Sequence, residues 1–195
     1  MEENLNRMID EIHSLAIEKG WWDTDRPLSE TLMLICSEWS EAIEEARAGH
    51  PEHYYQKKPE CDECMLEDES DPICVFCACP SKRKPEGVCV ELIDGVIRIF
   101  DFLGYVGAEM EGPGTLEEAA ELEDVSDMSL CEIVHALTQL TSDIETVDVN
   151  AVESLLRCVS IVSGYCIAHG FDPELLLWEK HEYNKLRPRK HGKRF

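Results

Sequence analysis

The sequence lacks several features that would place the protein in a familiar class. It has no apolar run approaching the roughly 20 residues that cross a bilayer. Its start, Met1-Glu2-Glu3-Asn4, lacks the basic and apolar regions of a secretory signal. It contains neither a GxxxxGK[ST] phosphate-binding loop nor the adjacent His-Asp pair of one class of metal phosphohydrolases. We therefore expect a cytoplasmic protein without a membrane partner, and we disfavour these two classes of nucleotide hydrolase.

Basic residues are scarce and unevenly placed. The 195-residue chain has 18 Lys and Arg against 41 Asp and Glu, a formal net charge of −23. This charge would repel a phosphate backbone, so binding to duplex nucleic acid is not expected. An acidic body with a basic tail over 180–195 suits a ligand that combines divalent cations with phosphate groups, although an acidic surface that only maintains solubility is the simpler explanation. The tail contains Lys180, Lys185, Arg187, Arg189, Lys190, Lys193 and Arg194.

Apolar residues make up 44% of the chain, and their spacing predicts helices. Ser29 and Gly49 are typical start and stop signals for one of these helices, and the alternation typical of strands is absent. The segment 117–127 is expected to be a solvated linker or a short helix. We predict an all-α fold in a single domain over 1–195, with helices at 5–19, 29–48, 86–106, 129–146, 150–169, and from 172 to a point before 188.

The ten cysteines fall into two groups. Five lie in apolar helical segments, where a buried cysteine acts as a small hydrophobe. The other five lie in a proline-rich segment, 50–84, which has no helical period and includes two CxxC pairs nine residues apart. Two such pairs can supply four thiolates to one Zn²⁺, whereas a disulfide cluster is disfavoured in a reducing cytoplasm. We predict an inserted loop over 50–84 that a structural zinc folds, with Cys79 as an alternative to the last ligand of the set Cys61, Cys64, Cys74 and Cys77.

Two acidic pairs are the main candidates for chemistry. Glu38 and Glu41 are three residues apart in one predicted helix, and Glu91 and Asp94 are three apart in another, where Arg98 follows on the same side. Residues at this spacing share a helix face. If the helices pack against each other, four carboxylates converge, and a hard cation such as Mg²⁺ relieves their repulsion. The competing interpretation is that such pairs simply lie on solvated helix faces.

Further segments accompany these acidic pairs. They are EKGWWD at 18–23, SEWSEA at 37–42, KPEG at 84–87, ELID at 91–94 and KHEYNKLRP at 180–188. Their combination resembles the MazG-like, all-α nucleotide pyrophosphohydrolases over roughly 1–48, 84–108 and 170–193. The segment 50–84 departs from that family, in which this connection is usually much shorter. The resemblance implies a helical bundle that hydrolyses a nucleoside or deoxynucleoside triphosphate, with Mg²⁺, to the monophosphate and pyrophosphate.

The resemblance also implies roles for individual residues. Lys180, Asn184 and Arg187 match a K-x-x-x-N-x-x-R pattern that contacts phosphate or sugar in related enzymes. Metal neutralises phosphate charge and assists attack by water. We assign the Mg²⁺ ligands as Glu38, Glu41, Glu91 and Asp94, with Glu41 also orienting or deprotonating the attacking water.

Two adjacent tryptophans, Trp21 and Trp22, offer a surface for base stacking or a packing contact between the first two helices. We assign Trp22 and Arg98 to substrate binding and leave packing as the role of the other tryptophan. The rival function from a different class is a catalytically silent, zinc-stabilised helical module that binds a nucleotide or a protein.

The second half of the chain resembles a degenerate copy of the first. The segment 138–145 can be laid over 37–44, and 153–156 over 91–94. In related enzymes two subunits, or two halves of one chain, form a four-helix bundle, so one chain here can supply both halves and carry one site. A homodimer is not excluded, and any two amphipathic helices can align this well. The copy replaces three of the four acids, with Gln139, Ser142 and Leu156.

Overall fold

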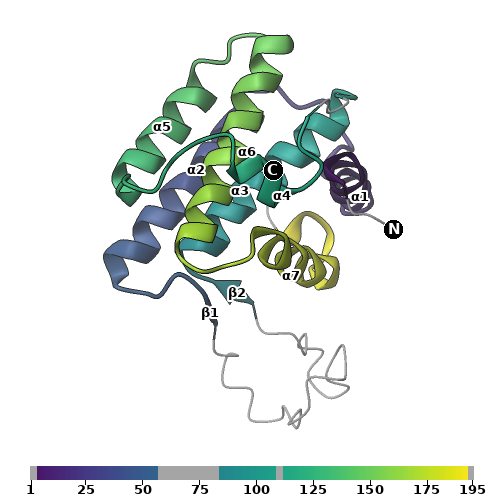
Figure 1. The fold of residues 1–195 in the computed structure, drawn as a ribbon. Helices are drawn as coiled ribbons and strands as arrows, with labels where there is room; N and C mark the ends of the chain where they lie inside the picture. The colour runs from purple at the N-terminus through teal and green to yellow at the C-terminus, as the bar shows by residue number, and fades with distance from the viewer. Residues whose placement is uncertain (1–3, 57–83, 109–111, 193–195) are drawn as a thin grey trace, which may run out of the picture.

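The computed structural model describes residues 4–56, 84–108 and 112–192, apart from the side chains of 191 and 192. Over these ranges the chain is mostly helical, which confirms the predicted all-α class (Figure 1). The two CxxC pairs lie outside the described residues. The helices are α1 (Leu5–Glu18), α2 (Leu28–Ala48), α3 (Val88–Tyr105), α4 (Leu116–Ala120), α5 (Leu130–Ser142), α6 (Val149–Ala168) and α7 (Pro173–Leu186), followed by a 3-10 turn, Arg189–Gly192.

Helix ends are set by local chemistry. Asn4 accepts a hydrogen bond from the amide of Arg7 at the start of α1, and Asp172 does the same for the first turn of α7. Gly49 ends α2 in the left-handed conformation that glycine adopts without strain (φ 74°). The expected start of α2 at Ser29 is one residue late, because the helix begins at Leu28, directly after Pro27. Proline has a fixed φ and therefore serves as a boundary without a side-chain cap.

α3 is the central helix of the fold. It packs against α1, α2, α6 and α7, while α5 packs against α2 and α6 (Figure 1). The helices α2, α3, α5 and α6 therefore form a four-helix arrangement. The predicted apolar stripe of α3 is fully buried, and so is much of the opposite side, because neighbouring helices cover it. The stripe consists of Val88, Leu92, Val96, Ile99 and Leu103.

Two short strands correct the expectation that strands are absent. β1 (Tyr54–Tyr55) and β2 (Pro85–Glu86) pair antiparallel, with Tyr54 opposite Glu86. A backbone hydrogen bond of 2.9 Å from Gln56 to Lys84 continues the pairing. Gln56 and Lys84 therefore lie next to each other.

By length and composition alone, α6 would pass as a membrane-spanning helix, with a mean hydropathy of 1.4. No such run was expected from the sequence. More than half of the apolar window is buried among other helices of the fold. Such burial is what a core helix of a helical bundle shows.

Candidate metal and nucleotide site

Three carboxylates from two helices converge beside the centre of α3. The side-chain oxygens of Glu38 on α2, and of Glu91 and Asp94 on α3, all lie within 4.8 Å of one another. Glu38 is 4% exposed and Glu91 is 2% exposed. Acidic side chains are rarely buried to this degree unless they are paired or bind a metal. The interpretation of these pairs as solvated helix faces therefore fails for Glu38 and Glu91.

The close approach of α2 and α3 depends on a glycine. Trp39 is fully buried, and a Cβ atom placed on Gly95 would lie 2.1 Å from Cζ3 of its indole ring. The indole Nε1 donates to Oγ1 of Thr141 on α5 at 3.3 Å, which fixes the ring from the other side. Because Gly95 has no side chain, the two helices meet closely at this level. Glu38 and Asp94, which directly precede Trp39 and Gly95 in the sequence, are therefore brought together.

Glu41 stands apart from the other three predicted ligands. It is exposed, one helical turn after Glu38, and is not among the converging oxygens. Its charge still raises the pKa of Glu38. Glu41 therefore lies on the solvent side of the acidic cluster, close enough for its charge to affect the pKa of Glu38.

Two cations of the chain lie against the cluster. The Nζ atom of Lys180, on α7, is 2.8 Å from Oδ2 of Asp94 and 3.7 Å from Oε1 of Glu91, and it donates to the carbonyl of Pro85 at 3.2 Å. Lys180 is 0% exposed. Burial alone would lower the pKa of this ammonium group, but the charges of Asp94 and Glu91 outweigh burial and raise it. Arg98 donates through Nε to Glu38.

The carboxyl groups of the cluster differ in their protonation. Burial, together with a hydrogen bond with Glu86, raises the pKa of Glu91 to about 9, against the opposing charge of Lys180. Burial would also raise the pKa of Glu86, but hydrogen bonds from Glu91 and Lys84 outweigh it and lower that pKa. The hydrogen bond between these two carboxyl groups therefore favours the protonated form of Glu91 and the ionised form of Glu86. Burial likewise raises the pKa of Glu38, although Arg98 opposes it.

These residues fit a hard divalent cation. The donors are carboxylate oxygens, which Mg²⁺ prefers, and they come from two helices that hold them close together. The raised pKa values of Glu38 and Glu91 mean that added positive charge would favour their ionised forms. The cluster therefore has both the ligand type and the electrostatic demand of such a site.

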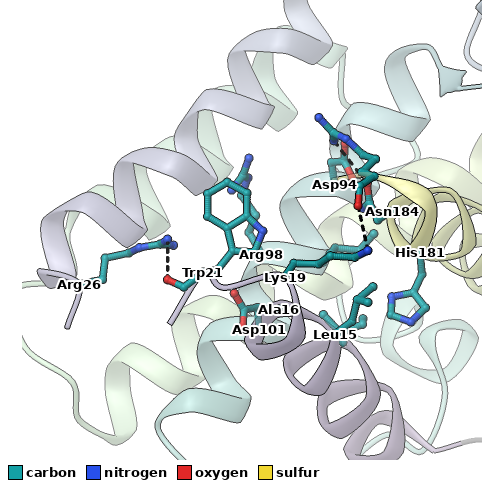
Figure 2. Close-up of a pocket in the computed structure, with 13 residues that line it drawn as sticks. Leu15, Ala16, Lys19, Trp21, Arg26, Asp94, Arg98, Asp101, His181 and Asn184 are labelled. Carbon is teal, nitrogen blue, oxygen red and sulfur yellow. Dashed lines mark hydrogen bonds between the residues drawn. The ribbon is translucent and has the colours of Figure 1, made fainter. Parts of the chain in front are cut away.

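A pocket of about 90 Å³ opens next to the cluster and shares Asp94 with it (Figure 2). Its walls come from α1, from the α1–α2 connection, from α3 and from α7. It combines apolar floor residues with four cations and the indole of Trp21. Such a mixture suits a ligand with an aromatic part and an anionic part. The lining is Ile12, Leu15, Ala16, Lys19, Trp21, Arg26, Asp94, Ile97, Arg98, Asp101, His181, Asn184 and Arg187.

Three of the predicted substrate-binding residues line this pocket: Arg98, Asn184 and Arg187. The C-terminal end of α7 is fixed there by Lys19, whose ammonium group donates to the carbonyls of Lys185 (2.6 Å) and Arg187 (2.9 Å). A cation at a helix C-terminus also interacts favourably with the helix dipole. By contrast, Lys180, the first residue of the predicted pattern, is engaged in the acidic cluster.

The two tryptophans of the α1–α2 connection lie in different surroundings. Trp22 stacks on Tyr105 with ring centroids 4.0 Å apart and an interplanar angle of 9°, and its Nε1 donates to Asp101 at 2.7 Å. Trp21 lines the pocket, and the guanidinium of Arg26 lies 5.5 Å from its ring centroid. The structure thus places Trp21 in the lining of the pocket and Trp22 in a packing contact outside that lining, so the substrate contact assigned to Trp22 stays a prediction.

Several residues of the site were missed by the sequence reasoning. Glu86 was taken only as part of a family segment, although its position just before Gly87 and α3 brings it to Glu91. His181 and Asp101 both line the pocket. A signal for Asp101 was present, because it is seven residues after Asp94 and therefore lies on the same face of α3.

The four-helix arrangement also bears on the predicted internal copy. The helix pair α5–α6 packs against α2–α3, with α2 next to α5 and α3 next to α6. At the positions that match the acidic pairs, Gln139, Ser142 and Glu153 are exposed, and Leu156 is partly buried. Within the described ranges, only Glu38, Glu91 and Asp94 gather as a candidate metal-binding group of His, Cys, Asp or Glu side chains.

Comparison with known proteins finds no match among family models, curated proteins or solved structures.

Proposed function

We propose that this protein is a Mg²⁺-dependent nucleotide pyrophosphohydrolase of the MazG-like type. The observation that carries the proposal is the convergence of three carboxylates, two of them buried, at the edge of a pocket lined by cations and an indole. The sequence resemblance supplies the family, and the all-α fold agrees with it. The substrate class is a nucleoside or deoxynucleoside triphosphate.

In this proposal, Glu38, Glu91 and Asp94 would hold the metal ion. A bound Mg²⁺ would neutralise phosphate charge and make the α-phosphorus more electrophilic. Arg98 and Arg187 line the adjacent pocket and would bind phosphate oxygens there. Trp21 would stack on the base, and Asn184 would hydrogen-bond the sugar or a phosphate oxygen.

The reaction consumes one water molecule. Its oxygen forms a bond to the α-phosphorus, and the bond between that phosphorus and the bridging oxygen of the β-phosphate breaks. Pyrophosphate leaves, and the nucleoside monophosphate carries the new oxygen. Glu41, exposed beside the cluster, is the proposed group that orients the water or takes its proton.

A pyrophosphate-release assay tests this function. Purified protein with Mg²⁺ is supplied with each common ribonucleoside and deoxyribonucleoside triphosphate, and pyrophosphate is quantified. We expect turnover of at least one nucleotide, loss of turnover with EDTA, and loss in Glu38→Gln. Glu44→Gln, which changes an exposed glutamate six residues further along α2, is the matched control and should retain activity.

If no triphosphate is hydrolysed and Glu38→Gln leaves nucleotide affinity unchanged, the acidic cluster is not a nucleotide–metal site. Binding of a nucleotide without hydrolysis would instead favour the silent binding module.

We further propose that the segment between the two strands binds one structural Zn²⁺ through its CxxC pairs. The antiparallel pairing of β1 and β2 supports a closed insert, because it holds the two ends of this segment together. Metal analysis of protein purified under reducing conditions should find about one zinc per chain. Cys61→Ser should lose it, whereas Cys131→Ser, an exposed cysteine on α5, should not. Protein without zinc would remove this proposal and leave the enzymatic one intact.

A further inference from the structure

Lys180 is an unusual element of this site because a lysine is almost never fully buried. Its ammonium group has three nearby oxygens: Asp94 at 2.8 Å, the carbonyl of Pro85 at 3.2 Å, and Glu91 at 3.7 Å. Two of these oxygens belong to the carboxylates that converge with Glu38. Lys180 thus supplies positive charge to the same groups that would bind a divalent cation.

Arg98 supplies charge to the third carboxylate. Its Nε donates to Glu38, and the side chain also lines the pocket. Three carboxylates therefore face two cations that belong to the chain, from two different helices. The charge of the cluster is largely balanced without a metal ion.

A divalent cation cannot share these oxygens with both chain cations at no cost. Like charges a few ångströms apart repel strongly in a site that excludes water. The side chains of lysine and arginine are long and can reorient, whereas the carboxylates are held by two packed helices. Metal binding therefore favours departure of the ammonium and guanidinium groups from the carboxylates.

The pocket lies where the displaced groups would go. Asn184, four residues after Lys180 and therefore on the same side of α7, lines it, and so does Arg187 just beyond the end of the helix. Arg98 already lines it from α3. An anionic ligand in the pocket would offer both cations new partners in place of the carboxylates.

We propose that Lys180 and Arg98 are built-in counter-ions that a divalent cation displaces, so that cation and nucleotide phosphate bind with positive coupling. This inference rests on the proposed function, because it concerns the same site. The metal ion would bind the carboxylates, and the phosphate would bind the released ammonium and guanidinium groups. Coupling of this kind is reciprocal, so each ligand tightens the other by the same factor.

The test measures affinity for Mg²⁺ alone, by isothermal titration calorimetry, and needs no turnover. Lys180→Met removes the competing charge and should bind Mg²⁺ about tenfold more tightly than the native protein, a factor typical of coupled sites. Lys185→Met removes a lysine from the same helix that pairs with Glu11 and Glu182 instead, and should leave the affinity unchanged. Equal or weaker Mg²⁺ affinity in a folded Lys180→Met protein would overturn the inference.

A second measurement covers the case in which Lys180→Met does not fold. Native protein is treated briefly with an amine-acylating reagent, and modification of each lysine is read by mass spectrometry. Lys180 should be protected without metal and become several-fold more reactive with Mg²⁺, while Lys185 stays constant. A nonhydrolysable α,β-imido triphosphate added with Mg²⁺ should restore protection. No change at Lys180 on adding Mg²⁺ would overturn the inference.

The failure of this inference can be distinguished from the failure of the proposed function. A protein that shows the metal-dependent change at Lys180 but hydrolyses no nucleotide would contradict the proposed function and support the counter-ion exchange. A protein that hydrolyses nucleotides but shows equal Mg²⁺ affinity with and without Lys180 would do the opposite.

Discussion

Replacing Gly95 with alanine should damage both the stability of the fold and the acidic site. The new Cβ atom would lie 2.1 Å from Cζ3 and 2.4 Å from Cη2 of Trp39, far inside van der Waals contact. Trp39 is fully buried and hydrogen-bonded to Thr141, so its indole ring has little room to move. The strain must therefore be relieved by separating α2 from α3, the two helices that hold the carboxylates.

The size of the effect follows from two opposing terms. Overpacking a core by one methyl group costs about 1–3 kcal/mol. Alanine is favoured over glycine in a helix by about 1 kcal/mol, which offsets part of that loss. A contact as short as 2.1 Å places the overpacking cost in the upper half of its range. The net loss should then be about 1–2 kcal/mol, and for a chain of this size that lowers Tm by roughly 2–8 °C. Displacement of Glu38 from Asp94 should also reduce Mg²⁺-dependent pyrophosphate release, on the order of tenfold or more.

Thermal unfolding monitored by circular dichroism, together with the pyrophosphate assay, measures both effects. Trp39→Phe provides the companion variant, because a smaller ring leaves space for the alanine methyl group. The double variant should be more stable than the sum of the two single losses predicts, with a coupling of about 0.5–3 kcal/mol. If Gly95→Ala is as stable as the native protein or more so, helix preference outweighs packing and the account of the α2–α3 contact is wrong.

Three further predictions concern the pocket and its surroundings. Burial lowers the pKa of His181, with a smaller effect from Lys185, so the unfolded chain binds more protons than the native state below about pH 6.5. The free energy of unfolding should therefore decrease as the pH drops through that region. Urea titrations of His181→Gln should show a smaller decrease than those of the native protein, and an equal decrease would contradict this. Trp21→Ala should raise the KM for the nucleotide several-fold while Trp22→Phe leaves it nearly unchanged, and steady-state kinetics showing the reverse would return Trp22 to the ligand side. The stack of Trp22 on Tyr105 should give a double-mutant coupling of about 0.5–1.5 kcal/mol in chemical unfolding, and a coupling near zero would show that the two rings do not stabilise each other.

Much of the fold could be predicted because the buried side of a helix appears in the sequence as apolar residues at regular spacing. The stripe from Val88 to Leu103 placed α3 correctly, and Gly49 marked the end of α2. The pattern could not show that other helices pack against α3 on several sides. Periodicity identifies an apolar face, but the burial of the opposite side depends on helices far away in sequence. Glu91 therefore appeared to be on a polar face, although α7 covers it.

The acidic site was partly predictable for a related reason. The i, i+3 spacing correctly grouped Glu91 with Asp94, but it also grouped Glu41 with Glu38, which face different surroundings in the structure. The helix pair packs closely at the level of Glu38, and Glu41 lies beyond that contact, toward solvent. The short pairing of β1 with β2 left no alternating pattern, since each strand has two residues.

The role of Lys180 was hidden by its neighbours in sequence. Lys180 is the first residue of a basic segment, which suggests a phosphate-binding tail. The resemblance to the MazG-like family also implies that Lys180 contacts phosphate. Its position on the inner side of α7 is what directs its amine to Asp94. The sequence shows the charge of a residue, but its ion-pair partner depends on which side of its helix packs against the rest of the protein.

The most direct test of the central claim is pyrophosphate release from triphosphates with and without Mg²⁺, in native protein and in Glu91→Gln. The account predicts Mg²⁺-dependent release of one pyrophosphate per nucleoside monophosphate formed, and its loss in the variant, because Glu91 lies in the converging set of carboxylates. Release that continues in Glu91→Gln, or no release from any triphosphate despite correct folding, would contradict it.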